Sequence, residues 1–147
     1  MKTFKFETSL ILPRKLEELF GFFSDAGNLE TITPSWLRFE ITTPGPIAIA
    51  VGTKINYKLR YRGIPLRWTS EILIWEPNIR FIDSQISGPY RKWIHEHSFR
   101  EVDGGTLCKD HVEYSVWGGY LANHLVVKND IEKIFSFRSQ KLTELFG

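Results

Sequence analysis

The last part of the chain places the strongest constraint on the fold. Residues 120–146 contain neither Gly nor Pro, and their apolar side chains recur at a spacing close to 3.6 residues. This spacing predicts one helix of ~27 residues, roughly 40 Å long at 1.5 Å per residue. A helix with such a stripe must bury it against another large element. The stripe comprises Leu121, Leu125, Val127, Ile131, Ile134, Phe135, Leu142 and Leu145.

Strands dominate the chain before this helix. Residues 4–12 alternate between polar and apolar at first and predict one strand. Pro13 suits the first turn of a short helix, whose apolar face holds Leu16, Leu19, Phe20 and Phe23. Residues 24–33 predict a second short helix that ends before Pro34. Six more strands, separated by turn residues, are predicted at 36–42, 53–62, 66–75, 79–87, 92–102 and 106–116.

This order of elements defines a fold class. Strands joined by short turns form an antiparallel meander. One face of the predicted sheet is polar and meets water, and the C-terminal helix is the only element long enough to cover the other face. A strongly curved sheet around one helix leaves a gap, and an aromatic content of 14% supplies rings to wall it. We predict one α+β domain over residues 1–147, β-α-α-β6-α, with a curved antiparallel seven-stranded sheet wrapped around the helix.

Composition excludes several classes of protein. The balance of 19 Lys+Arg against 17 Asp+Glu, net +2, is too small to indicate nucleic-acid binding. A single cysteine, Cys108, excludes a disulfide framework and a thiolate zinc site, and it favours the reducing cytoplasm. No apolar run approaches the ~18 residues of a membrane span. A basic strip leaves transient contact with a membrane surface open, although a solvated face is favoured; it comprises Lys58, Arg60, Arg62, Arg67 and Arg91.

Turn positions predict which side chains share the inner face of the sheet. A two-residue loop at Asp103-Gly104 pairs Val102 with Gly105. The same register then pairs Phe99 with Cys108, His97 with Asp110, His95 with Val112 and Trp93 with Tyr114, all on one face. A loop at Gly63-Ile64 pairs Leu59 with Trp68, Tyr57 with Ser70 and Ile55 with Ile72.

Several segments resemble a known family. They are Gly63–Trp68, Trp75-Glu-Pro77, Phe81–Tyr90, Trp93–Phe99, Gly105-Thr106, Asp110–Tyr114 and Ile134–Arg138. Together with the order of elements they resemble the START-related, helix-grip (SRPBCC) superfamily of polyketide cyclase/dehydrase and lipid-transport domains. The resemblance implies a hydrophobic tunnel that holds a lipid, a quinone or a polyketide, and it implies no single reaction. It also favours Phe81, Asp83 and Gln85 on the inner face of strand 79–87, whereas apolarity alone favours Ile82 and Ile86.

The predicted inner face carries an unusual polar group of side chains, Asp83, Gln85, His95, His97, Asp110 and Tyr114. Burying them is costly unless they satisfy one another or a ligand. Histidines i and i+2 on a strand could bind a metal with Asp110, but a buried hydrogen-bonded group or contacts to a ligand are favoured. We expect no metal and no cofactor. His97 with Asp110 is also the candidate pair for general acid–base catalysis.

Three functions follow, and the first is favoured. In the first, the chain binds a hydrophobic small molecule between the sheet and the helix. In the second, it is a cyclase or dehydratase that uses His97 and Asp110. In the third, it is an interaction protein with a vestigial cavity. The candidate ligand-binding residues are Tyr57, Trp68, Ser70, Phe81, Asp83, Gln85, Trp93, His95, His97, Asp110, Tyr114 and Ile131.

Overall fold

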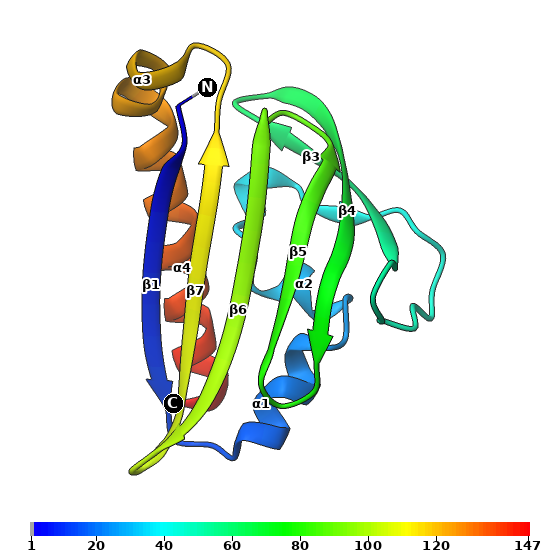
Figure 1. Ribbon diagram of the computed structural model, residues 1–147, viewed down its shortest axis with the longest axis vertical. Coiled ribbons are helices and arrows are strands. Elements are labelled where there is room, and N and C mark those ends of the chain that lie inside the picture. Colours follow the sequence, from blue (N-terminus) through cyan, green and yellow to red (C-terminus); the bar gives the residue numbers. More distant parts are fainter. Residues whose placement is uncertain (1) are drawn as a thin grey trace.

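The computed structural model describes residues 2–147 and consists of one sheet, a helical segment near the start and a long helix at the end (Figure 1). The strands are β1 (Phe4–Leu12), β2 (Glu40–Ile41), β3 (Lys54–Tyr61), β4 (Ile64–Glu76), β5 (Arg80–Ser87), β6 (Lys92–Val102) and β7 (Gly105–Ser115). They form a seven-stranded sheet in the order β1-β7-β6-β5-β4-β3-β2, and every pairing is antiparallel. The predicted fold class and order of elements are confirmed.

The C-terminal helix forms where the sequence predicts it. Its parts follow one another without a break: α3 (Gly119–Ala122), the π-helical segment η2 (Asn123–Val127) and α4 (Lys128–Phe146). Gly118 has a φ of 90° and lets the chain turn out of β7 into the helix. The buried Asn123 accepts a hydrogen bond of 2.7 Å from the Tyr114 hydroxyl, which fixes the start of the helix to β7. No helix within residues 2–147 is long and apolar enough to cross a membrane.

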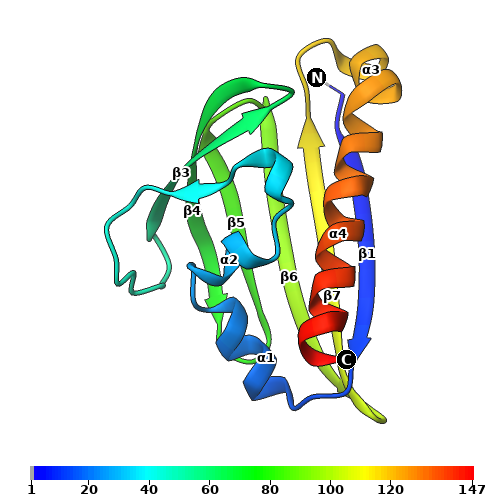
Figure 2. The ribbon, with the colours of Figure 1, turned by 180° about the vertical axis from the view of Figure 1, so that it is seen from behind.

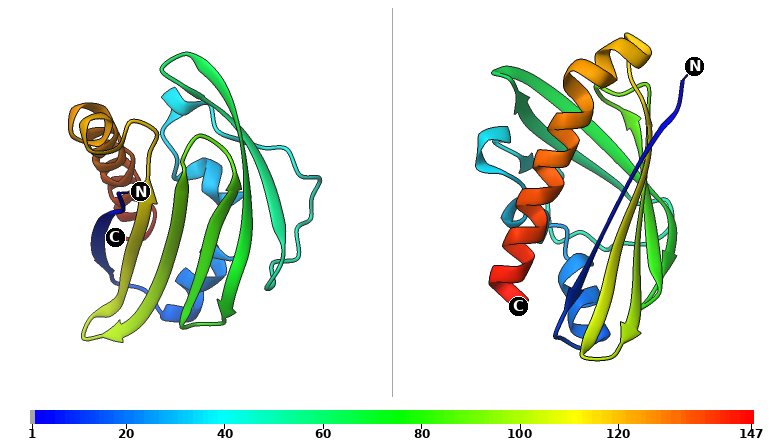
Figure 3. Two further views of the ribbon diagram at one scale, coloured as in Figure 1. Left: turned by 45° about the horizontal axis from the view of Figure 1, so that its top comes forward. Right: turned by 90° about the vertical axis from the view of Figure 1, so that its left-hand side faces the viewer.

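The helices cover one face of the sheet but leave its centre open. Figure 2 shows α4 over β1 and β7, and α1 (Leu16–Phe23) with α2 (Asn28–Thr31) over the other half. Figure 3 shows the curvature of the sheet around the C-terminal helix. The apolar face of α1 is buried as predicted, in a core cluster that includes Leu19, Phe20, Phe81, Phe99 and Leu142. A second cluster, under the helix, includes Val112, Tyr114, Ile131 and Phe135.

Two local predictions are wrong. In place of a strand over 36–42 the chain forms one 3₁₀ turn, η1 (Ser35–Leu37), and only the two residues of β2. Arg38, with a φ of 47°, interrupts the extended backbone. The β3–β4 loop is Arg62-Gly63, because both central residues of this turn need positive φ, here 50° and 81°, which disfavours Ile there.

The corrected loop moves each cross-strand partner by two residues and keeps the faces. Tyr57 pairs with Trp68 instead of Ser70, and Leu59 pairs with Leu66. The β6–β7 hairpin has the predicted register throughout, with His97 opposite Asp110 and Trp93 opposite Tyr114.

Candidate functional site

A cavity of about 350 Å³ lies between the inner face of β3–β6 and the C-terminal helix. Its walls are mostly aromatic and aliphatic, and the rings of Trp68, Tyr90 and Trp93 support one another through tilted and edge contacts of 4.8–5.5 Å. Other apolar lining residues are Leu29, Leu37, Phe39, Leu59, Leu66, Val116, Trp117, Val127, Ile131, Ile134 and Phe135. The volume lies near the lower end of the ~300–1,000 Å³ that is common for small-molecule sites.

One end of the cavity is polar. Five side chains meet there, and we call them the buried polar cluster: Asp83, His95, His97, Asp110 and Arg138. His97 Nε2 lies 2.8 Å from Asp83 Oδ2, and His95 Nε2 lies 2.7 Å from Asp110 Oδ1. The two imidazole rings stack with their centres 3.6 Å apart. Asp83 and Asp110 belong to the strands on either side of β6, so each carboxylate bonds diagonally to a histidine of the central strand.

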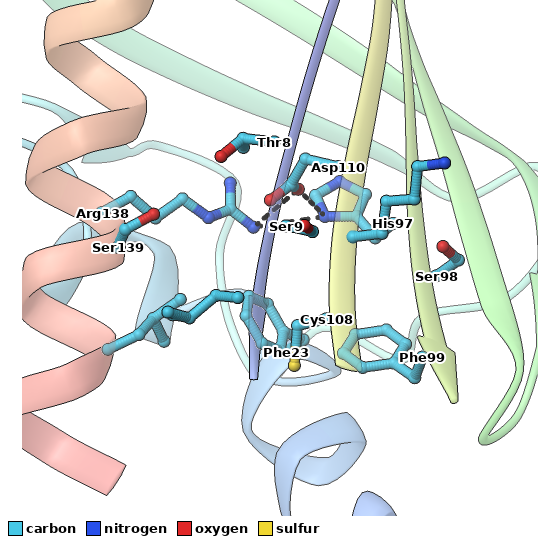
Figure 4. Close-up of a pocket in the computed structure, with 13 residues that line it drawn as sticks. Thr8, Ser9, Phe23, His97, Ser98, Phe99, Cys108, Asp110, Arg138 and Ser139 are labelled. Atoms are coloured by element: carbon cyan, nitrogen blue, oxygen red, sulfur yellow. Dashed lines mark hydrogen bonds and ion pairs between the residues drawn. The ribbon is translucent and has the colours of Figure 1, made fainter. Parts of the chain in front are cut away.

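Arg138 brings the helix into this cluster. Its Nη2 atom lies 3.2 Å from His97 Nδ1 and 3.6 Å from Asp110 Oδ1 (Figure 4). The guanidinium also lies over the rings of Phe23 and Phe135, at 5.3 and 5.6 Å. Its Nε is the only buried side-chain nitrogen or oxygen in residues 2–147 without a hydrogen-bond partner. The aromatic faces therefore replace part of the hydration that this cation has lost.

The contacts define the protonation of His97. Because a guanidinium can only donate, Nδ1 of His97 accepts from Arg138, and Nε2 carries the proton that is donated to Asp83. Burial, with the neighbouring His95, lowers the pKa of His97 to about 4, so the ring is neutral at pH 7. Both nitrogens of His97 are then engaged.

Both carboxylates stay ionised. Burial alone would raise the pKa of Asp83, but the hydrogen bond from His97 and the nearby positive charge bring it below its ordinary value. Burial acts on Asp110 in the same way and is outweighed by the charge of Arg138 and the hydrogen bond from His95, so its pKa is also lowered. The cluster therefore holds two carboxylates, the guanidinium of Arg138 and the neutral ring of His97.

The cluster also contains the one set of side chains in residues 2–147 with the spacing of metal ligands. One ligand atom each from Asp83, His95 and His97 lies within 4.8 Å of the others. Two imidazoles and a carboxylate suit several divalent metals. However, each Nε2 is hydrogen-bonded to a carboxylate, and Arg138 places a positive charge beside His97. A cation would have to displace these bonds against that charge, so the residues fit a metal poorly.

The structure brings most of the predicted site residues to the cavity. Tyr57, Trp68, Ser70, Asp83, Trp93, His95, His97 and Ile131 line it. Ser70 accepts a 2.9 Å hydrogen bond from Trp68 Nε1, which fixes both side chains in the wall.

The other four predicted residues lie around the cavity. Phe81 stacks under His97, with ring centres 4.1 Å apart, and belongs to the core. Gln85 exchanges two hydrogen bonds with the backbone of Tyr90 and holds the β5–β6 turn. Asp110 lies behind the histidines, and Tyr114 bonds to the helix. On strand β5, Phe81 and Asp83 point inward, as the resemblance predicted.

The predicted His97–Asp110 pair is replaced by a different set of bonds. The two residues are cross-strand neighbours, but His97 Nδ1 lies 3.5 Å from Asp110 Oδ1, and Asp110 bonds to His95 instead. His97 forms its hydrogen bond with Asp83 on the neighbouring strand β5.

Two helix residues of the site are missing from the sequence-based set. Arg138 lies seven positions after Ile131, so both share the inner face of the helix, and a charged residue on an apolar face was the available signal. Asp130 accepts hydrogen bonds from the Tyr61 hydroxyl and, at 3.2 Å, from Arg62, which joins the helix to the β3–β4 hairpin beside the cavity. Nothing in the sequence pairs these distant residues.

The curved sheet, the gripped helix and the cavity between them define a START-like helix-grip protein. The family model described as polyketide cyclase / dehydrase and lipid transport matches residues 12–135, and the chain belongs to this family. A search of curated proteins gave no match.

Solved structures with this fold come from distant sources. Protein CV1439 from Chromobacterium violaceum aligns with a TM-score of 0.75 at 12% identity, over 97% of both chains. Protein Ms6760 from Mycobacterium smegmatis aligns with a TM-score of 0.71 at 14% identity, over 96% of this chain and 89% of the other. Ginseng major latex-like protein 151 from Panax ginseng aligns with a TM-score of 0.70 at 10% identity, over 99% of this chain and 98% of the other. At such identities the likeness establishes the fold.

Proposed function

We propose that the protein binds one small hydrophobic molecule in the cavity between the sheet and the C-terminal helix, as a carrier or a store. The observation that carries this proposal is the 350 Å³ cavity itself, walled by aromatic and aliphatic side chains between the sheet and the C-terminal helix. An apolar space of this size stays open only at the cost of lost contacts. A guest that fills it restores those contacts, and the family description, which includes lipid transport, agrees with such a guest.

The state of His97 favours binding over acid–base catalysis. A general base needs a free lone pair within reach of the substrate proton. The Nδ1 lone pair of His97 is engaged by Arg138, and its Nε2 proton is engaged by Asp83. The candidate pair of His97 and Asp110 therefore lacks a nitrogen that is free to accept a proton.

A cavity-filling variant tests the proposal. Leu59 lines the cavity from β3, and Leu59→Trp places an indole in the space that a guest would occupy. Leu73→Trp is the matched control, because Leu73 is 42% exposed on β4 and lies outside the cavity. The probe is N-phenyl-1-naphthylamine, a neutral apolar dye whose fluorescence rises when it leaves water.

The wild-type protein and Leu73→Trp should bind the dye saturably at one site with the same affinity. Leu59→Trp should weaken binding by about tenfold or more, since each factor of ten corresponds to ~1.4 kcal/mol of lost contact. The proposal fails if the wild-type protein shows no saturable binding, or if Leu59→Trp binds as well as the control. Native mass spectrometry of the purified protein would identify a guest that is retained from the host cell.

A further inference from the structure

The charges at the polar end of the cavity are unbalanced on the side that faces the guest. Arg138, the only guanidinium of the buried polar cluster, also lines the cavity, and its Nη2 atom lies 3.6 Å from Asp110 and 3.2 Å from His97. Asp83 lines the cavity, and among the described residues its one ion-pair partner is His97, which is neutral at pH 7. The charge of Arg138 is thus paired with Asp110, and no Lys or Arg of the described residues forms an ion pair with Asp83.

One of the two carboxylate oxygens of Asp83 also lacks a hydrogen-bond donor among the described residues. Oδ2 of Asp83 accepts the proton of His97, and Oδ1 receives no hydrogen bond from a described residue. Burying a carboxylate oxygen without a donor is unfavourable, and a guest that fills the cavity displaces the water that would otherwise donate to it. The guest must supply the donor itself.

Two neighbouring hydroxyls can adapt to such a guest. Ser70 Oγ accepts from Trp68 Nε1 and has its own proton to donate, and Tyr57 lines the same wall. Burial, with the nearby Asp83 charge, raises the pKa of Tyr57 above its ordinary value, so it remains a neutral phenol. This end of the cavity thus offers one negatively charged acceptor, two neutral hydroxyls and a guanidinium that is already paired with Asp110.

We propose that the cavity selects apolar guests whose polar end is an uncharged O–H or N–H donor, such as a phenol or an alcohol, and rejects the corresponding carboxylates. This inference rests on the proposed function and adds the chemical class of the ligand. A carboxylate oxygen of Asp83 accepts a hydrogen bond from the O–H or N–H group of the guest. A carboxylate guest places a second negative charge against Asp83 in a site of low polarity, where like charges repel strongly.

Three probes with the same ring system test this selectivity by isothermal titration calorimetry at neutral pH. 2-Naphthol has a donor, 2-methoxynaphthalene has the oxygen without the donor, and 2-naphthoate carries the charge. 2-Naphthol should bind the wild-type protein tightest, the ether about threefold to tenfold more weakly, and 2-naphthoate at least about tenfold more weakly than 2-naphthol.

Asp83→Asn removes the charge and keeps the shape of the side chain. In this variant the discrimination against 2-naphthoate should fall to about threefold or less, mainly because the carboxylate binds better. Asp103→Asn is the matched control, since Asp103 is exposed in the β6–β7 turn and its loss changes the net charge equally. It should leave all three affinities unchanged. If Asp83→Asn fails to fold, Asp83→Glu, which keeps the charge, should retain the wild-type order of the probes.

The outcomes separate this inference from the proposed function. If none of the probes nor the neutral dye binds, the function itself is wrong. If the dye and the probes bind but 2-naphthoate equals or exceeds 2-naphthol, the protein is a binding protein and the selectivity for donors is refuted. Selectivity that survives in Asp83→Asn would refute the role of Asp83.

Discussion

Arg138 is expected to be the most sensitive position of the buried polar cluster. It is 9% exposed, and its guanidinium is the only cation beside the Asp110 carboxylate and the His97 ring. Arg138→Met keeps much of the side-chain length and the contact with the rings of Phe23 and Phe135. What the substitution removes is the charge, which leaves Asp110 as a buried carboxylate with His95 as its remaining partner.

The magnitude follows from the cost of an uncompensated charge. Removing one partner of a buried ion pair costs about 3–5 kcal/mol of unfolding free energy. For a chain of this size, such a loss lowers Tm by roughly 10 °C. Arg138→Met combined with Asp110→Asn should recover part of the loss, because the buried carboxylate is then also neutral.

The loss should also depend on pH. In the wild-type protein the folded-state pKa of Asp110 lies below its unfolded value, so the carboxylate contributes stability above that value and loses it as the pH falls through the folded pKa. Without Arg138 burial dominates, the pKa of Asp110 rises, and protonation relieves the penalty in mild acid. The charge of Arg138 also lowers the pKa of His97, so its removal eases protonation of His97 in the same range. The difference between variant and wild type should therefore shrink between about pH 7 and about pH 4.5.

Urea unfolding at both pH values measures these differences. Arg100→Met is the control, because Arg100 is exposed on β6 and such a substitution changes stability by about 0.5 kcal/mol or less. A neutral-pH loss for Arg138→Met as small as that of Arg100→Met would show that the cation is not needed. A loss that is equal at both pH values would show that packing, and not charge, is its origin.

Three further predictions follow from burial. Burial, with the Asp110 charge nearby, raises the pKa of the Cys108 thiol to about 12. Cys108 should therefore resist iodoacetamide in the folded protein and react at once in urea. Ready alkylation of the native state would contradict this prediction. Burial raises the pKa values of Tyr57 and Tyr90, so their ultraviolet titration should be delayed beyond that of free tyrosine. The free energy of unfolding should fall from about pH 10 upward, where the unfolded chain releases these protons first. One equivalent of Zn²⁺, followed by excess EDTA, should leave Tm within about 1 °C, and a rise of several degrees that EDTA reverses would reveal a built metal site.

Sequence patterns predicted the fold well because its determinants are local. The helix over 119–146 follows from a long stretch without Gly or Pro, and the β6–β7 register follows from the Asp103-Gly104 turn. The β3–β4 loop was misplaced by one residue because Arg62 adopts positive φ, which sequence propensity disfavours for a side chain of this kind. Alternation still preserved the faces, which is why the set of inward side chains was correct on these strands.

The bonds within the site could not be predicted in the same way. The alternation of side chains along a strand places His95 and His97 on one face. Which carboxylate each histidine bonds to, however, depends on how the two stacked rings are tilted toward β5 or β7. Arg138 enters from an element 41 residues away in sequence from His97, and its position depends on how the helix crosses the sheet. Such long-range contacts leave no signal in one sequence beyond a charged residue on an apolar helix face.

The position of the cluster explains why the space above it stays open. Phe81 and Phe23 lie on its core side, and the cavity lies on the other. If the helix moved onto β3 and β4 to close the cavity, Asp83, whose side chain is 21% exposed, would lose its remaining access to water, and the nearby Arg138 is already paired with Asp110. Closure would gain apolar contacts and lose the solvation of a charge. The same carboxylate that chooses the polar end of a guest therefore opposes collapse of the cavity when no guest is bound.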